Sequence, residues 1–212
     1  MTSLVRVLLV DDHAVVREGY RRLLERDARI QVVGEASNSV QACECALAVD
    51  PEVIVMDIAL PGVSGIEAMR RILARRPQQC VLMFSMYDDG IFASRALEAG
   101  ARGYVSKASA PEVLVDAISA VARGERYLSP DVQKILALQA SAQAKSVVNT
   151  LTPREFEVLR LLVRGDTVKR IGEKLGLSEK TVANHQSAIR EKLGARNAVQ
   201  LARVATELGL SL

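Results

Sequence analysis

The chain has 212 residues, of which 49% are apolar and 25% are charged, and a net charge of +3, which suits one large or two small domains with filled cores. No apolar run approaches the ~20 residues of a membrane span, and the N-terminal segment has a strand pattern, which argues against a signal peptide, so we expect a cytoplasmic protein without membrane insertion. Cys43, Cys45 and Cys80 are odd in number and lack metal-site spacing, so we expect buried, reduced thiols.

Apolar runs and helical periodicity alternate along the first part of the chain. The expected strands are Val5–Val10, Ile30–Ala36, Val53–Ile58, Cys80–Ser85 and Gly103–Ser106, and the expected helices cover residues 15–24, 40–49, 65–75, 91–99 and 111–123. This alternation predicts an α/β fold with a doubly wound, five-stranded parallel sheet. A dinucleotide-binding fold has no support, because no Gly-x-Gly-x-x-Gly follows a strand.

Polar residues lie at or just past the carboxyl ends of four expected strands: Asp11-Asp12, Asp57, Ser85 and Lys107. They share the sheet edge at which α/β proteins bind ligands. Three carboxylates repel one another unless a cation such as Mg²⁺ lies among them, and the Lys and Ser side chains suit phosphoryl oxygens. The set predicts a phosphoryl-transfer site with an aspartate as nucleophile. Taken singly, Asp57 can also cap a turn, and Ser85 can be a turn residue.

These motifs resemble the receiver domain of bacterial two-component response regulators, a flavodoxin-like fold, over about residues 4–123. The resemblance is carried by Val10-Asp11-Asp12-His13, Met56-Asp57-Ile58-Ala59-Leu60-Pro61-Gly62, Ser85 and Ser106-Lys107. It implies that Asp57 accepts a phosphoryl group from a sensor histidine kinase. One departure is Ala108, which stands where many receivers have proline after the lysine, and this weakens the case for a cis peptide bond at that position.

The same resemblance implies roles for the surrounding residues. Asp11, Asp12, Asp57 and the main-chain carbonyl of Ala59 would hold Mg²⁺. Lys107 would contact the acyl phosphate, Ser85 would move toward it, and the Tyr104 ring would rotate inward; Tyr104 can also be ordinary strand packing. The pair Asp88-Asp89 is expected to open the fourth helix, where acids suit the helix dipole.

The chain changes character after residue 126. Residues 127–147 read as a partly helical linker rich in Ala, Gln and Ser, between domains at 1–126 and 148–212, and its Ile135, Leu136 and Leu138 can dock on either domain. Residues 1–126 carry 15 basic and 17 acidic side chains, whereas residues 127–212 carry 13 and 8. The basic second part indicates a polyanionic partner.

The last part is expected to be a small helical domain. Thr152 and Glu155 form a capping box, so helices are expected at 153–164, 168–175, from Ser178 to Leu193, and 197–208. The tight turn Gly176-Leu177-Ser178 predicts a helix-turn-helix. On the third helix Val182, Ile189 and Leu193 share one face, and Lys180, Asn184, Ser187 and Glu191 share the opposite one, which suits either the major groove of DNA or a solvated surface.

This part resembles the LuxR-type DNA-binding domain over about residues 148–210. The resemblance is carried by Leu151-Thr152-Pro153-Arg154-Glu155, Leu177-Ser178-Glu179-Lys180-Thr181-Val182, His185 and Lys192-Leu193-Gly194. It implies DNA contacts by Lys180, Thr181, Asn184, Ser187 and Lys169, and a packing role for His185. Ala183 and Gln186 depart from the usual basic and apolar residues. Together the two domains resemble the NarL/FixJ regulators, with the hexose-phosphate uptake regulators as the nearest subgroup.

We therefore expect a non-enzymatic transcription regulator switched by phosphorylation of Asp57. Its partners would be a sensor histidine kinase, double-stranded promoter DNA and a second copy of itself, with RNA polymerase as a further candidate. One alternative is a phosphatase with Asp57 as nucleophile, although Ala59 stands where such enzymes carry a second acid. Another is a regulator controlled by protein contacts without phosphorylation.

Overall fold

The computed structural model describes residues 4–86, 90–140, 151–195, 197 and 200–201. The chain divides into two compact units, Met1–Ala140 and Ser141–Leu212, which are described separately. The pair Asp88-Asp89, the end of the expected linker and most of the expected helix 197–208 lie outside the described residues. Within the described residues, no helix combines the length and apolar character needed to cross a membrane.

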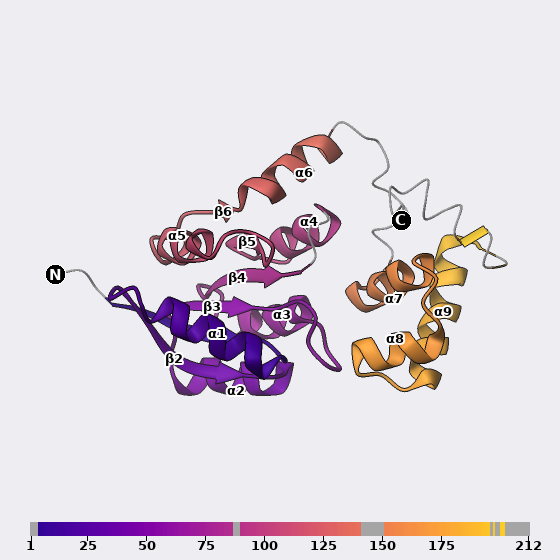
Figure 1. Cartoon of the computed structure of the whole chain (residues 1–212), viewed down its shortest axis with the longest axis horizontal. Helices are drawn as coiled ribbons and strands as arrows, with labels where there is room; N and C mark the ends of the chain where they lie inside the picture. Colours follow the sequence, from indigo (N-terminus) through magenta and orange to yellow (C-terminus); the bar gives the residue numbers. More distant parts are fainter. Residues whose placement is uncertain (1–3, 87–89, 141–150, 196, 198–199, 202–212) are drawn as a thin grey trace. The chain divides into compact units, whose positions relative to one another are not determined.

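The first unit is built on one parallel sheet with the strand order β2-β1-β3-β4-β5-β6 (Figure 1). Its strands are β1 Val5–Val10, β2 Ile30–Ala36, β3 Val53–Met56, β4 Cys80–Ser85, β5 Gly103–Ser106 and β6 Tyr127–Leu128. The doubly wound α/β prediction is confirmed, but the sheet has six strands where five are expected. β3 ends at Met56, so Asp57 is the first residue after the strand.

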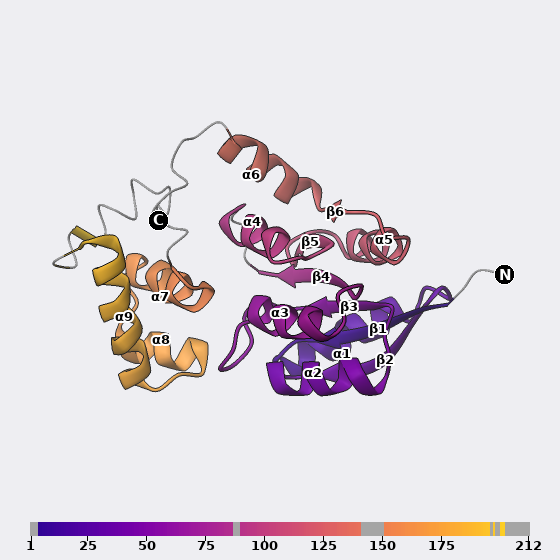
Figure 2. The same ribbon diagram turned by 180° about the vertical axis from the view of Figure 1, so that it is seen from behind.

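Helices cover both faces of this sheet, as Figures 1 and 2 show from opposite sides. The helices of this unit are α1 Ala14–Leu24, α2 Ser39–Ala48, α3 Gly65–Arg75, α4 Gly90–Glu98, α5 Pro111–Ala122 and α6 Pro130–Ala140. Leu24 of α1 and Ile118 of α5 pack with Val7, Val55 and other strand residues in one buried cluster. Alternation along the strands turns the equally buried neighbours Leu8, Ile54 and Met83 to the other face.

The sixth strand alters the end of the first unit. Tyr127 donates its main-chain N–H to the Arg102 carbonyl at 3.2 Å, and Ser129 donates to the Tyr104 carbonyl at 3.0 Å. The Ser106 amide donates to the buried Ser129 hydroxyl at 3.3 Å. The sequence pattern predicts a linker from residue 127, whereas here the chain satisfies the otherwise open edge of β5. Helix α6 then packs on α4 and β5.

A glycine allows α3 to begin directly against the loop that carries Asp57. Ser64 caps this helix by accepting from the Glu67 amide at 3.4 Å. Gly65 donates its N–H to the Ile58 carbonyl at 2.9 Å. A Cβ atom at Gly65 would lie 1.8 Å from the main-chain oxygen of Asp57. Only glycine fits this approach, because any side chain would overlap the main chain next to the candidate acceptor.

The described part of the second unit contains α7 Pro153–Val163, α8 Val168–Leu175 and α9 Glu179–Leu193. The capping box is present: Glu155 donates its N–H to the Thr152 hydroxyl at 3.2 Å, and Thr152 donates its N–H to the Glu155 carboxylate at 2.6 Å. Gly176 ends α8 in the left-handed conformation at φ 62°. A Cβ at Gly172 would lie 2.7 Å from the Leu177 carbonyl, so this glycine permits the tight turn into α9. The arrangement is a helix-turn-helix.

Candidate functional site

Two adjacent parallel strands bring the first two carboxylates of the site together. Val10 at the end of β1 pairs with Met56 at the end of β3. Asp11 and Asp57 follow these residues, and each is 3% exposed. Asp57 donates its main-chain N–H to the Val10 carbonyl at 2.9 Å, so the strand pairing itself fixes the start of the loop.

Lys107, which follows β5, joins the two aspartates. Its ammonium lies 2.6 Å from Asp11 Oδ2 and 2.5 Å from Asp57 Oδ2. Burial opposes the charge of Lys107, but the two carboxylates outweigh it and raise its pKa. Burial raises the pKa of Asp57; Lys107 opposes this shift and Asp11 adds to it. With two buried carboxylates and one ammonium, the cluster favours a further cation.

Asp12 and His13 lie beside this cluster. The His13 Nδ1 atom lies 2.7 Å from Asp12 Oδ1, and the His13 main-chain N–H donates to Asp11 Oδ1 at 2.8 Å. One ligand atom from each of Asp11, Asp12 and His13 falls within 4.8 Å of the others. Carboxylate oxygens from Asp11, Asp12 and Asp57 are the hard donors that Mg²⁺ prefers, so the residues fit such an ion.

A pocket of about 340 Å³ opens over Asp57. It is lined by His13, Val16, Tyr20, Asp57, Ala59, Met86 and Lys107. The Ala59 amide donates to Asp57 Oδ1 at 3.3 Å, while Oδ2 faces Lys107. The predicted metal contact of the Ala59 carbonyl stays a prediction. The pocket is large enough for a phosphoryl group and gives a donor to each side of the acceptor.

Ser85 and Tyr104 lie inside the same part of the unit and are fully buried. Ser85 ends β4 opposite Ser106, and its carbonyl accepts from the Lys107 amide at 2.8 Å. The Tyr104 ring is already inside the protein, which is the position expected for it after Ser85 moves. The structure thus brings Ser85 close to Lys107 along the chain ends of β4 and β5.

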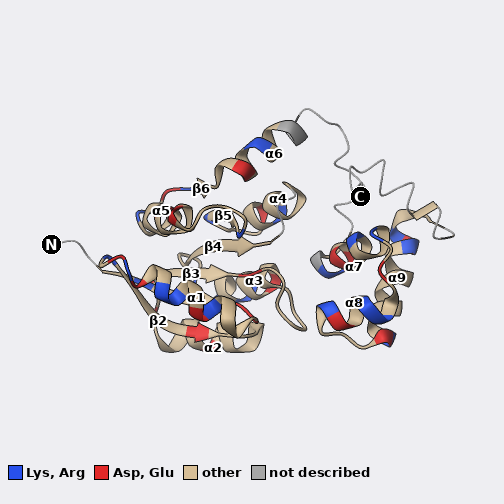
Figure 3. Ribbon diagram, viewed as in Figure 1, with Lys and Arg blue, Asp and Glu red and all other residues tan. Residues whose placement is uncertain are grey.

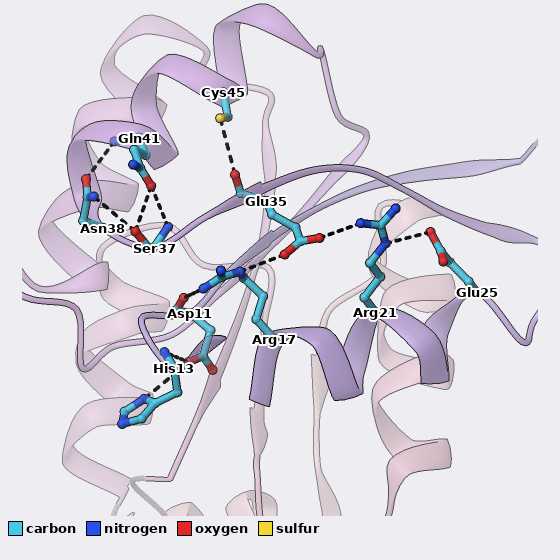
Figure 4. A network of polar contacts seen from close by, with 10 residues as sticks. All are labelled: Asp11, His13, Arg17, Arg21, Glu25, Glu35, Ser37, Asn38, Gln41 and Cys45. Carbon is cyan, nitrogen blue, oxygen red and sulfur yellow. Dashed lines mark hydrogen bonds and ion pairs between the residues drawn. The ribbon is translucent and has the colours of Figure 1, made fainter. Parts of the chain in front are cut away.

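One contact of this site has no signal in the sequence pattern. The guanidinium of Arg17 on α1 donates from Nη1 to the main-chain carbonyl of Asp11 at 2.6 Å (Figure 4). Arg17 is one of several arginines on the polar side of an amphipathic helix, and nothing in its spacing separates it from the exposed ones. Its role depends on the approach of α1 to the β1 end, which only the fold defines.

In the second unit, α9 presents the two faces that its periodicity predicts. Val182, Ile189 and Leu193 are buried, and the opposite face is exposed: Lys180, Asn184, Ser187 and Glu191. The Ser187 hydroxyl donates to the Ala183 carbonyl at 3.1 Å. Lys169 is exposed on α8, where Figure 3 shows basic residues. This exposed side can meet a polyanion.

Thr181 and His185 are less exposed than the residues on that face. Thr181 donates its N–H to the capping Ser178 at 3.1 Å, and the two hydroxyls lie 2.8 Å apart. His185 is half-buried, and burial lowers the pKa of its imidazole. Both observations fit residues that fix the start and packing of α9.

Polar contacts of Arg154 and Glu155 link α7 to the other two helices of this unit. Lys192 of α9 donates to Glu155 of α7 at 2.7 Å. Arg154 donates to Glu157 at 2.6 Å and to the Leu175 carbonyl, the last residue of α8, at 2.6 Å. Arg154 therefore positions α8 relative to α7, and Glu155 positions α9 relative to α7. These two contacts give a structural reason for an arginine and a glutamate at these adjacent positions.

Comparisons with known proteins cover nearly the whole chain. Residues 7–119 match the response regulator receiver domain, and residues 149–205 match the bacterial regulatory proteins of the luxR family. The response regulator UvrY of Escherichia coli O6:H1 is 36% identical over 209 residues, which cover 98% of this chain and 96% of UvrY. The response regulator GacA of Pseudomonas aeruginosa is 35% identical, with 98% of each chain covered.

Solved structures give the same result. A LuxR-family two-component response regulator from Aurantimonas sp. SI85-9A1 has a TM-score of 0.64 and 45% identity, and covers 65% of this chain and 99% of its own. RcsB from Salmonella enterica serovar Typhimurium, bound to the promoter rprA in the presence of the phosphomimetic BeF3⁻, has a TM-score of 0.65 and 28% identity, with 96% and 99% covered.

Proposed function

Because the chain belongs to the NarL/FixJ-type response regulators, DNA-binding transcription regulators of two-component systems, we propose that Asp57 accepts a phosphoryl group from a sensor histidine kinase. The observation that carries this proposal is the setting of Asp57. The carboxylate is buried at the base of an open pocket, with Lys107 on Oδ2 and the Ala59 amide on Oδ1. It is thus held at one face of a space that a phosphoryl group can enter.

In the proposed transfer, an oxygen of Asp57 forms a bond to phosphorus while the bond from phosphorus to the histidine nitrogen of the kinase breaks. The product is an acyl phosphate on Asp57. Lys107 offsets the negative charge, since its ammonium already lies 2.5 Å from Asp57 Oδ2. Asp11, Asp12 and Asp57, with the Ala59 carbonyl, would hold Mg²⁺, whose charge would stabilise the transferring group.

In the proposed response to phosphorylation, the conformational change begins at Lys107, involves the ends of β4 and β5, and leads to dimerisation and binding of promoter DNA. Ser85 would shift toward the phosphoryl oxygens and Tyr104 would keep its buried position, which favours one arrangement of the β4 and β5 ends. RcsB is described as dimers on two parallel DNAs, and we propose a phosphorylation-favoured dimer here as well. The DNA-contacting residues would be Lys169, Lys180, Thr181, Asn184 and Ser187. The protein would act in the cytoplasm, where it meets promoters and RNA polymerase.

The proposed division of labour follows the two compact units. Residues 1–126 would receive the phosphoryl group, residues 148–212 would bind DNA, and the chain between them would connect the two. The sheet-bound segment Tyr127–Ala140 then lies on the receiver side of that connection. Assignment to the hexose-phosphate subgroup stays a prediction.

The acceptor is tested by labelling the full chain with a small acyl-phosphate donor and Mg²⁺. We expect one base-labile phosphoryl group per chain, which Asp57→Ala abolishes. Asp116→Ala, at an exposed acid on α5, is the matched control and should label normally. Undiminished labelling of Asp57→Ala would refute the assignment. A wild-type chain that takes no label but binds its promoter would support control by protein contacts instead.

A further inference from the structure

All four polar groups of Asp11 are held from different parts of the first unit. Its N–H donates to the Ala36 carbonyl of β2 at 3.1 Å. Its Oδ1 accepts from the His13 amide at 2.8 Å, and its Oδ2 accepts from Lys107 at 2.6 Å. Its carbonyl accepts from Arg17 at 2.6 Å. β1 ends at Val10, so the Arg17 guanidinium supplies to the Asp11 carbonyl the kind of hydrogen bond that strand pairing supplies to the residues before it.

Arg17 is itself fixed by a chain of ionic contacts between α1 and β2 (Figure 4). Its Nε donates to Glu35 Oε2 at 2.8 Å, and the other carboxylate oxygen of Glu35 accepts from Arg21 at 2.8 Å. Arg21 also donates to Glu25 at 3.3 Å. The Arg17 side chain is only 17% exposed, so these contacts are more than a loose surface pair.

The charges in this network balance. Two guanidinium groups meet two carboxylates, so Arg17 brings a strong donor close to Asp11 while Glu35 offsets its positive charge. An unpaired arginine at this place would repel a metal ion. The planar shape of the guanidinium matters as well, because its Nε donates to Glu35 while its Nη1 donates to the Asp11 carbonyl. A lysine ammonium is a single point charge and cannot make both hydrogen bonds in this geometry.

We propose that Arg17 is a positioning residue for the metal site. By donating a hydrogen bond to the Asp11 carbonyl, it fixes the turn from which the Asp11 and Asp12 carboxylates would bind Mg²⁺. This inference rests on the proposed Mg²⁺ site. The turn joins the end of β1 to the start of α1, and the Arg17 bond is the contact that holds its Asp11 carbonyl. The Arg17 amide also donates to the His13 carbonyl at 2.9 Å, so both the main chain and the side chain of one residue close this turn.

The test is the Mg²⁺ affinity of the full chain, measured by titration calorimetry. Arg17→Met and Arg17→Lys should each weaken Mg²⁺ binding about tenfold, as expected for loss of a group that orients a metal ligand. Arg22→Met is the matched control: Arg22 lies on the same helix, its side chain is 78% exposed, and it pairs with Glu18 on the helix surface, so the Mg²⁺ affinity of this variant should equal that of the wild type. Ile118→Val controls for general loosening of the same unit, because this buried residue lies in the core.

A second measurement separates positioning from chemistry. Asp57 and Lys107 are intact in Arg17→Met, so saturating Mg²⁺ should restore its maximal labelling rate, while the Mg²⁺ concentration for half-maximal labelling rises about tenfold. Glu35→Gln removes the charge that aligns Arg17, and combining it with Arg17→Met should add little, because the two residues act as one unit.

The outcomes decide between the two proposals. Wild-type affinity in Arg17→Met or Arg17→Lys would overturn the role of Arg17. Equal weakening by Ile118→Val would reduce that role to general stability and overturn it too. If Arg17→Met does not fold, Arg17→Lys and Glu35→Gln decide by the same criterion. A wild-type chain that binds no Mg²⁺, with Asp57 still labelled, would refute the metal site and the Arg17 proposal with it.

Discussion

Replacing Gly65 by alanine should disable the acceptor without touching any of its side chains. The new Cβ would lie 1.8 Å from the Asp57 carbonyl oxygen, 2.8 Å from its carbonyl carbon and 3.1 Å from Ile58 Cα. All three atoms belong to the main chain, so no side-chain rotation can relieve the overlap. Since non-bonded carbon and oxygen need about 3 Å or more, α3 and the Asp57 loop must separate by roughly 1 Å.

Two magnitudes follow from this displacement. Overpacking of this kind costs about 1–3 kcal/mol of unfolding free energy. A misplacement of about 1 Å at a reacting group costs on the order of 100-fold in rate. Alanine is the better helix former by about 1 kcal/mol, but that gain is small at the first residue of a helix and does not offset the clash.

The assay compares Gly65→Ala with Gly19→Ala in the full chain. Gly19 lies within α1 with nothing within 4 Å of its added Cβ, so this matched control should be stabilised by about 0.5–1 kcal/mol and label normally. Urea unfolding followed by circular dichroism gives the stability, and acyl-phosphate labelling with Mg²⁺ gives the rate. A Gly65→Ala chain with wild-type stability and wild-type labelling would refute the reasoning.

Three further predictions concern the second unit. Thr152→Ala should remove the capping box and lower the stability of this unit by about 1 kcal/mol; an unchanged urea midpoint would speak against the cap. Burial lowers the pKa of His185 below its ordinary 6.5, so the unfolded chain binds the proton more readily than the folded chain. The free energy of unfolding of this unit should therefore be highest above pH 6.5 and fall as the pH decreases below that value. Hydrogen exchange of α9 should show this pH dependence in the wild type but not in His185→Gln. Asn184→Ala should relax base preference at one operator position at a cost of about 1–3 kcal/mol, whereas Lys180→Ala should weaken all sequences alike, and site selection from random DNA would expose a reversal of these roles.

The main strands could be predicted because their residues are apolar without interruption. Val53–Met56 is buried on both faces, and this burial is what the continuous run indicates. Tyr127–Leu128 could not be found in the same way, since two residues have no periodicity and both are only half-buried. Their strand exists because β5 has an edge to pair with, which is a property of the assembled sheet.

For the candidate site, the location of the residues could be predicted from the sequence, but their contacts with one another could not. Asp11, Asp57 and Lys107 could be placed together, because parallel strands end at one edge. Their pairing could not: Lys107 contacts Asp11 and Asp57, while Asp12 turns to His13. These contacts depend on the directions of side chains that are 50 residues (Lys107 and Asp57) and 96 residues (Lys107 and Asp11) apart in the sequence.

A fragment that stops at Arg126 would leave β5 as an open sheet edge. The carbonyls of Arg102 and Tyr104 would lose the amides of Tyr127 and Ser129, and the buried Ser106 amide would lose the Ser129 hydroxyl. Open edges recruit strands from other copies. Such a fragment would associate with itself through mispaired strands, with or without a phosphoryl group on Asp57. Measurements of receiver self-association therefore need the chain through residue 140, where α6 ends.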